Sequence, residues 1–142
     1  MKEVKCATKA FIMDDEKLLV IKQGLKNINK GICEEIWDMP GGRMEFGLTP
    51  EENLKKEVKE EVCLDIEIKK LLGTSQFLNR KGDQVVCMNY LCEPKSKNVD
   101  ITKNPADEEN IVKFEWLTPK DFFAQLGDEQ PGLKDFVKKH FL

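Results

Sequence analysis

Apolar and polar residues alternate in short runs near the start of the chain, and a period of two is typical of β-strands. The runs Val4–Met13 and Leu18–Lys22 predict two strands, and the turn-forming segment Asp14–Lys17 between them indicates a hairpin. The polar, glycine-containing segment Gly24–Ile36 is expected to be a loop. The chain is therefore predicted to begin with a β-hairpin followed by a long connection.

The second half of the chain is expected to hold three more strands and two helices. Two β-favouring runs, Asp65–Leu78 and Gln84–Cys92, flank the turn residues NRKGD, and Ile111–Leu117 predicts a further short strand. A helix is expected to open at Thr118-Pro119, an N-cap and N1 pair, and to run through Leu126. Helical spacing near the C-terminus predicts a last helix with the apolar residues Leu133, Phe136, Val137 and Phe141.

The clearest helix signal lies in the middle of the chain. Thr49 is a suitable N-cap, Pro50 suits the first helical position, and Glu52 completes a capping box, so a helix is predicted over about 50–62. Its apolar stripe consists of Leu54, Val58 and Val62. Strands precede, flank and follow this helix, which predicts an α+β fold with a mixed central β-sheet flanked by helices.

Composition narrows the class of protein. A chain of 142 residues is expected to form one domain, 1–142. Its net charge is −3 and it has no basic block, which argues against a polymeric nucleic acid as partner. The absence of a long apolar run or a signal-like start predicts a cytoplasmic protein with no membrane partner. Five cysteines without a CxxC pair indicate neither a disulfide framework nor a zinc site.

Three glutamates crowd one side of the predicted helix. Glu57, Glu60 and Glu61 stand three and four residues apart, between the apolar stripe and the side that carries the lysines. Carboxylates about 6 Å apart repel by about 3 kcal/mol at an effective dielectric constant of about 20. One interpretation is a solvated acidic face on which Lys56 pairs with Glu60. The other is a site for a divalent cation.

The residues before the helix favour the cation. Gly41-Gly42 suits positive φ or a close approach of the backbone, and Arg43 after it is a candidate phosphate contact. Together with the three glutamates, this segment describes a place where Mg²⁺ could bridge protein and phosphate oxygens.

These residues resemble the Nudix box. In that family pattern a glycine precedes a first glutamate by six positions, and an Arg-Glu pair and a Glu-Glu pair follow on the helix. Matching positions here are Gly42, Glu57, Val58, Glu60, Glu61 and Leu64, and residues 37–41 (WDMPG) resemble the lead-in. The order of the other elements suits a Nudix α/β/α sandwich over nearly the whole chain.

Three positions depart from the pattern. Leu48 replaces the first glutamate, Lys56 replaces the arginine, and Cys63 replaces a late glycine. In the family the first glutamate and the arginine commonly pair to support the loop and helix, so their replacement is expected to change a structural ion pair. If the backbone at Cys63 is left-handed, the missing glycine costs about 1 kcal/mol.

The resemblance implies hydrolysis of a nucleoside diphosphate linked to another moiety, with Mg²⁺ or Mn²⁺ as cofactor and release of a nucleoside monophosphate. It implies Glu57 and Glu61 as metal ligands, Glu60 as ligand or general base, and the Gly42 carbonyl as a further ligand. Candidates outside the helix are Glu108 for the metal and Arg43, Lys22 and Glu45 for the substrate.

Three questions stay open. The stretch past the box, at 77–82, lacks the proline or tyrosine that some subgroups link with ADP-ribose or diadenosine polyphosphates, which favours a (d)NTP or modified nucleotide. An ADP-ribose pyrophosphatase remains an alternative. Another is a nucleotide-binding or regulatory domain that is catalytically silent because of Leu48 and Lys56. Many relatives dimerise, so a homodimer is also compatible with the resemblance.

Overall fold

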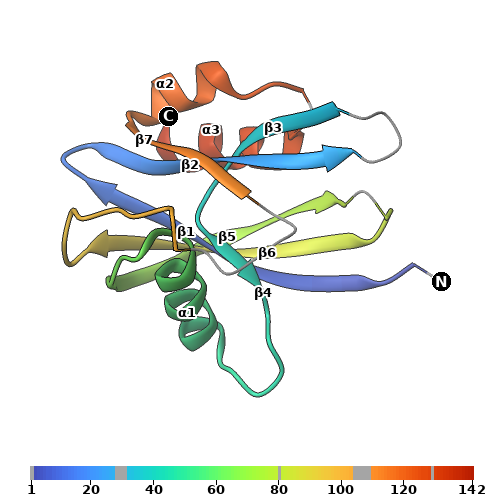
Figure 1. Ribbon diagram of the computed structural model, residues 1–142, viewed down its shortest axis with the longest axis horizontal. Helices are drawn as coiled ribbons and strands as arrows, with labels where there is room; N and C mark the ends of the chain where they lie inside the picture. The colour runs from blue at the N-terminus through green and yellow to red at the C-terminus, as the bar shows by residue number, and fades with distance from the viewer. Residues whose placement is uncertain (1, 28–31, 80, 104–109, 129) are drawn as a thin grey trace.

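A mixed β-sheet with helices packed against it forms the body of the protein (Figure 1). The computed structural model describes residues 2–27, 32–79, 81–103, 110–128 and 130–142. The strands are β1 (Val4–Asp14), β2 (Lys17–Asn27), β3 (Ile32–Asp38), β4 (Gly41–Arg43), β5 (Ile66–Leu78), β6 (Gln84–Pro94) and β7 (Asn110–Leu117). The helices are α1 (Pro50–Val62), α2 (Pro119–Gln125) and α3 (Pro131–Phe141). The predicted α+β architecture is confirmed.

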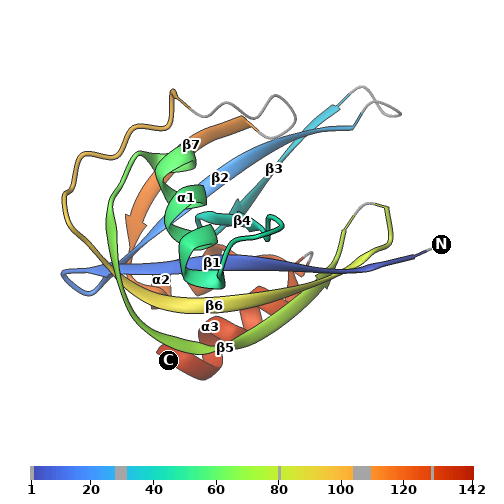
Figure 2. The ribbon, with the colours of Figure 1, turned by 90° about the horizontal axis from the view of Figure 1, so that it is seen from below.

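The sheet opens into two parts that meet along β1. The strand order is β3-β2-β1-β6-β5, with β4 paired to β1 and β7 paired to β2. β1 runs parallel to β6 over nine residues but pairs with β2 only through Met13↔Leu18 and Asp14↔Lys17. Because this joint is short, the two parts diverge, and α1 lies between them in the view from below (Figure 2).

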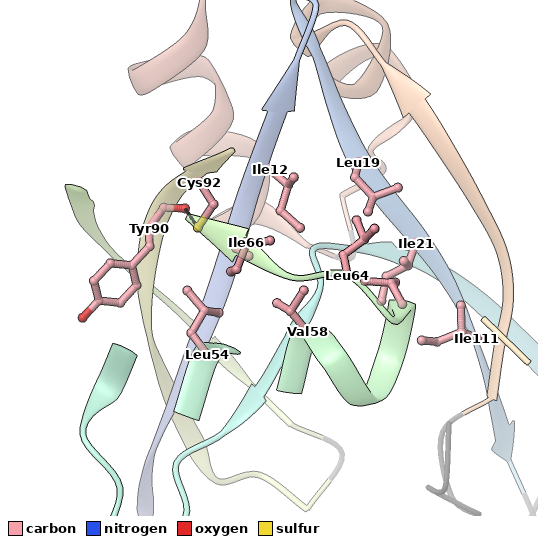
Figure 3. Packing of buried hydrophobic residues seen from close by; sticks show 12 residues of the cluster. Ile12, Leu19, Ile21, Leu54, Val58, Leu64, Ile66, Tyr90, Cys92 and Ile111 are labelled. Atoms are coloured by element: carbon pink, nitrogen blue, oxygen red, sulfur yellow. Dashed lines mark hydrogen bonds between the residues drawn. The ribbon is translucent and has the colours of Figure 1, made fainter. Parts of the chain in front are cut away.

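The predicted apolar stripe of α1 fills the space between the two parts (Figure 3). Leu54, Val58 and Val62 are fully buried, and they pack against residues such as Ile12 of β1 and Ile21 of β2. Burying side chains of this size contributes about 1.5–3 kcal/mol each. Packing against both parts of the sheet therefore fixes the rotation of α1, and with it the direction of its glutamates.

The opposite face of the sheet is covered by α2 and α3. Phe11 of β1 is fully buried there, with ring centroids 5.1 Å from Phe136 and 5.4 Å from Phe141 of α3. The helical spacing seen near the C-terminus therefore predicted a real packing face. Among the described residues, no helix is long and apolar enough to cross a membrane.

The prediction of a loop over 24–36 is wrong at both ends. β2 continues to Asn27, and β3 begins at Ile32 and pairs with it in an antiparallel register that includes Gly24↔Glu35. Ladder hydrogen bonds form whatever the side chains are, so a polar sequence can extend a hairpin beyond the core. The three-residue strand β4 was not predicted either, since two of its residues are glycines with low β propensity.

Candidate functional site

The connection from β4 to α1 ends in the predicted helix cap. Thr49 Oγ1 accepts the Glu52 N–H at 3.2 Å, and Glu52 Oε1 accepts the Thr49 N–H at 3.0 Å. This capping box satisfies two backbone donors that would otherwise lack partners. The start of α1 at Pro50 is thereby confirmed, and the helix has a fixed origin just after β4.

The glycine pair of β4 lies directly against two of the glutamates. The Gly41 N–H donates to Glu61 Oε1 at 2.7 Å, and Glu61 is only 6% exposed. A Cβ added to Gly42 would lie 2.4 Å from Glu57 Oε2, and one added to Gly41, at φ +150°, would lie 2.0 Å from the Thr8 carbonyl oxygen. The predicted close approach is confirmed, and it brings β4 into contact with the glutamate side of α1.

Asn53 connects the same region through its hydrogen bonds, although no role was predicted for it. Its Nδ2 donates to Thr8 Oγ1 at 3.0 Å and to the Gly42 carbonyl at 3.4 Å, and its Oδ1 accepts the Glu45 N–H at 3.0 Å. The side chain is fully buried. A signal was present: Asn53, Glu57 and Glu61 follow each other at four-residue spacing and therefore share one helix face.

The crowding of the three glutamates affects the pKa of Glu57. Burial raises the pKa of Glu57, the neighbouring Glu60 and Glu45 carboxylates raise it further, and Lys56 and Lys9 oppose them. Like charges and partial burial both disfavour the ionised form of a carboxyl group. The folded chain thus holds a carboxylate that a nearby cation would stabilise.

Glu60 faces a different partner. Lys56 Nζ lies 3.4 Å from Glu60 Oε1 at i,i+4, and it also pairs with Glu45. The Lys56–Glu60 pair expected for a solvated acidic face is therefore present, beside the buried contacts of Glu57 and Glu61. Lys56, which stands at the arginine position of the family pattern, pairs with Glu45. Because Leu48 has no carboxylate, Glu45 supplies one from the same loop in its place.

A second ion pair borders the site from the other side of β4. Lys9 Nζ of β1 lies 2.9 Å from Asp38 Oδ2 of β3, and the two side chains are only 11% and 18% exposed. Burial alone would lower the pKa of Lys9, but Asp38 and Glu61 outweigh it and leave the pKa raised. Lys9 is therefore charged and contributes to the field at Glu61. A lone lysine within the buried stretch of β1 was its signal in the sequence.

The candidate substrate residues are spread more widely. Arg43 is exposed at the end of β4, and Glu45 is held by Lys56. Lys22 lies on β2, 3.7 Å from Glu35 and 5.0 Å from the centroid of the Trp37 ring. Glu108 lies outside the described residues.

The donors fit Mg²⁺ in kind. No group of three or more acidic, histidine or cysteine side chains is arranged around a common point in the described part of the chain. Mg²⁺, however, is commonly held by one or two carboxylates together with waters and substrate phosphates. Glu57, Glu61 and the second lone pair of the Gly42 carbonyl supply hard oxygen donors of this kind, and Glu60 could join them by leaving Lys56.

Fold and site together define a class: an α+β sandwich whose central helix presents carboxylates to a glycine-containing strand. The NUDIX domain family model matches residues 5–140, and the chain belongs to the Nudix family. The crystal structure of a MutT protein from Methanosarcina mazei Go1 superposes with a TM-score of 0.78 at 16% identity, covering 98% of this chain and 94% of that chain. At this identity the likeness establishes the fold.

Two curated relatives share part of their length with this chain. A MutT-like protein of Streptomyces ambofaciens is 26% identical over 117 residues, or 82% of this chain and 65% of that protein. The 8-oxo-dGDP phosphatase NUDT18 of Homo sapiens is 31% identical over 101 residues, or 71% of this chain and 28% of that protein. The chain thus spans less than two thirds of the length of either.

Proposed function

We propose that this protein is a Mg²⁺- or Mn²⁺-dependent pyrophosphohydrolase that cleaves a nucleoside diphosphate linked to another moiety and releases a nucleoside monophosphate. The observation that carries the proposal is the contact of Glu57 and Glu61 with the Gly41-Gly42 pair of β4. This contact sets oxygen donors of one helix beside a backbone that has no side chain in the way. Family membership supports the same chemistry.

The residues have separate roles in this proposal. A bound Mg²⁺ would neutralise phosphate oxygens and lower the pKa of a bound water. Glu57 and Glu61 would hold the metal, and the Gly41 N–H orients Glu61. Glu60 is a further ligand or the general base once it leaves Lys56. Arg43, exposed at the end of β4, is available to bind phosphate.

The proposed substrate is a (d)NTP or a modified nucleotide. The absence of the ADP-ribose and dinucleotide signatures at 77–82 supports it, and so does the similarity to a relative named as an 8-oxo-dGDP phosphatase. A cytoplasmic location is part of the proposal: Cys6, Cys63, Cys87 and Cys92 are free thiols, as is usual in a reducing compartment. A homodimer remains a prediction that light scattering would test.

The decisive assay is hydrolysis of a panel of (d)NTPs, 8-oxo-dGDP, ADP-ribose, NADH and dinucleoside polyphosphates with Mg²⁺ or Mn²⁺. We expect turnover with release of a nucleoside monophosphate, fastest for a triphosphate or modified nucleotide. Preference for ADP-ribose would replace the substrate and keep the reaction class. Nucleotide binding without turnover would instead support a catalytically silent domain.

A variant links this turnover to the carboxylates. Glu61→Gln keeps an oxygen that accepts the Gly41 N–H but removes the charge, so we expect turnover to fall by several orders of magnitude with the fold intact. Glu3→Gln, an exposed carboxylate before β1, is the control and should behave like the original protein. Equal turnover in both variants would refute the assignment of Glu61.

A further inference from the structure

A groove of about 480 Å³ lies between α1 and the first half of β5. Glu51 and Lys55 line it from α1, and at 100° per residue they lie on a different side of the helix from Glu57 and Glu60. Residues 66–71 of β5 line its other side, and Figure 2 shows β5 curving past α1. The groove is therefore separate from the glutamate site, and its volume is in the range of small-molecule sites.

Unpaired positive charge surrounds the groove. Its lining includes Lys69, whose ammonium is engaged by Glu67 at 3.4 Å and by Glu93 at 3.8 Å. The remaining lysines of the lining are exposed and form no ion pair within the described part of the chain: Lys55, Lys70 and Lys95. Three ammonium groups thus stand against the single unpaired carboxylate of Glu51. This excess favours an anion with more than one charge.

The bottom of the groove is apolar and ends in a hydroxyl group. Ile66 is 2% exposed and Tyr90 is 6% exposed, and the hydroxyl end of the Tyr90 ring points away from the core cluster (Figure 3). That hydroxyl makes no hydrogen bond among the described residues. Burial raises the pKa of Tyr90, and Glu51 adds to the effect, so the hydroxyl keeps its proton and can donate it to an acceptor.

We propose that this groove binds an organic phosphate of nucleotide size, with its phosphates at the lysines and its organic part over Ile66 and the Tyr90 ring. Lysine ammoniums bind phosphate as point charges, and three of them match a diphosphate better than a single carboxylate. A ligand in this position would bridge α1 and β5. The inference is independent of the hydrolytic activity, because it uses none of the residues assigned to the reaction.

The test measures the affinity for ADP by isothermal titration calorimetry in the presence of EDTA. NMR then locates the binding site from the changes in amide chemical shifts. We expect ADP to shift amides of residues 51–55 and 66–71, and the double variant Lys55→Gln/Lys70→Gln to weaken this binding at least tenfold. Lys120→Gln/Lys138→Gln removes two exposed lysines from α2 and α3 and should bind ADP as the original protein does. Equal affinity in the two double variants, or shifts confined to β4 and residues 57–61, would overturn the proposal.

Two further measurements separate the parts of the ligand and of the groove. Pyrophosphate and adenosine should each bind more weakly than ADP if both halves of the groove are used. Tyr90→Phe should weaken ADP several-fold without lowering the melting temperature by more than a few degrees. Pyrophosphate binding as tightly as ADP, or an acidic peptide binding more tightly than either, would refute a nucleotide-sized organic phosphate as the occupant.

Discussion

Cys63 ends α1 with φ 59° and ψ 26°, in the left-handed region. A residue with a Cβ costs about 1 kcal/mol there relative to glycine, because the Cβ crowds the following carbonyl oxygen. We therefore expect Cys63→Gly to raise the free energy of unfolding by about 1 kcal/mol, measured by urea denaturation. Cys63→Ala keeps the Cβ and loses only the thiol, so it is the control. A glycine variant no more stable than the alanine variant would contradict this account.

Glu57 should make stability depend on pH. Its pKa in the folded protein is raised above the ordinary 4.5, so between the two values the folded chain binds more protons than the unfolded chain. The contribution of Glu57 to the free energy of unfolding therefore falls as pH rises through this window. In metal-free buffer, Glu57→Gln should flatten the fall, and urea denaturation between about pH 4 and pH 8 would measure it.

Glu3→Gln serves as the control for the pH experiment, because Glu3 is exposed and lies before β1. It should reproduce the pH profile of the original protein. If Glu57→Gln gives that same profile, burial and like charge do not act on Glu57 in the folded chain.

At single positions, the sequence predicted which residues belong to the site better than it predicted which residues they contact. The three glutamates and the glycine pair were found because their spacing is local to one helix and one turn. Asn53 and Lys9 were not, since their roles depend on Thr8 and Asp38, which lie 45 and 29 residues away. Only tertiary packing brings such pairs together.

At the scale of elements, the connection between β4 and α1 replaces one ion pair with another. Lys56 pairs with Glu45 across this connection, and Leu48 takes no part. We expect Leu48→Glu with Lys56→Arg to change the melting temperature modestly and turnover by less than about tenfold, or about 1.4 kcal/mol in the barrier. A hundredfold gain in turnover at constant stability would show instead that the natural loop impairs catalysis.

Elements were predictable where the sequence repeats a period. β1, β5, β6, β7 and α1 have apolar faces that pack on the core, so alternation or a helical stripe revealed them. Residues 24–35, where β2 ends and β3 begins, show no apolar alternation in the sequence, and these two strands pair with each other there. β4 forms because it pairs with β1, since its own residues have little β propensity. These elements depend on long-range pairing, which no local pattern encodes.

At the scale of the whole molecule, the Lys9–Asp38 pair connects β1, along which the two parts of the sheet meet, to the edge strand β3. Removing one member of a mostly buried pair leaves the other charge without compensation, at a cost of about 3 kcal/mol or more. We expect Lys9→Met to lower the free energy of unfolding by that amount in urea denaturation. Lys9→Met/Asp38→Asn should recover most of the loss.

Lys97→Met provides the comparison for this pair. Lys97 pairs with Asp14 at 2.9 Å, but its side chain is 73% exposed, and such surface pairs contribute about 0–1 kcal/mol. A loss at Lys9 no larger than the loss at Lys97 would mean that the Lys9–Asp38 pair contributes no more to stability than a surface pair.

The two glycines of β4 differ in how far they tolerate substitution. Gly41 is confined by the main chain of β1, because its missing Cβ would meet the Thr8 carbonyl oxygen, and no exchange of a side chain elsewhere can remove that obstacle. Gly42 is confined by the Glu57 side chain, and a shorter residue at position 57 would remove that obstacle. In a library of random variants screened for folded protein rather than for turnover, alanine at position 42 should therefore be recovered together with alanine at position 57, whereas position 41 should have no second-site suppressor.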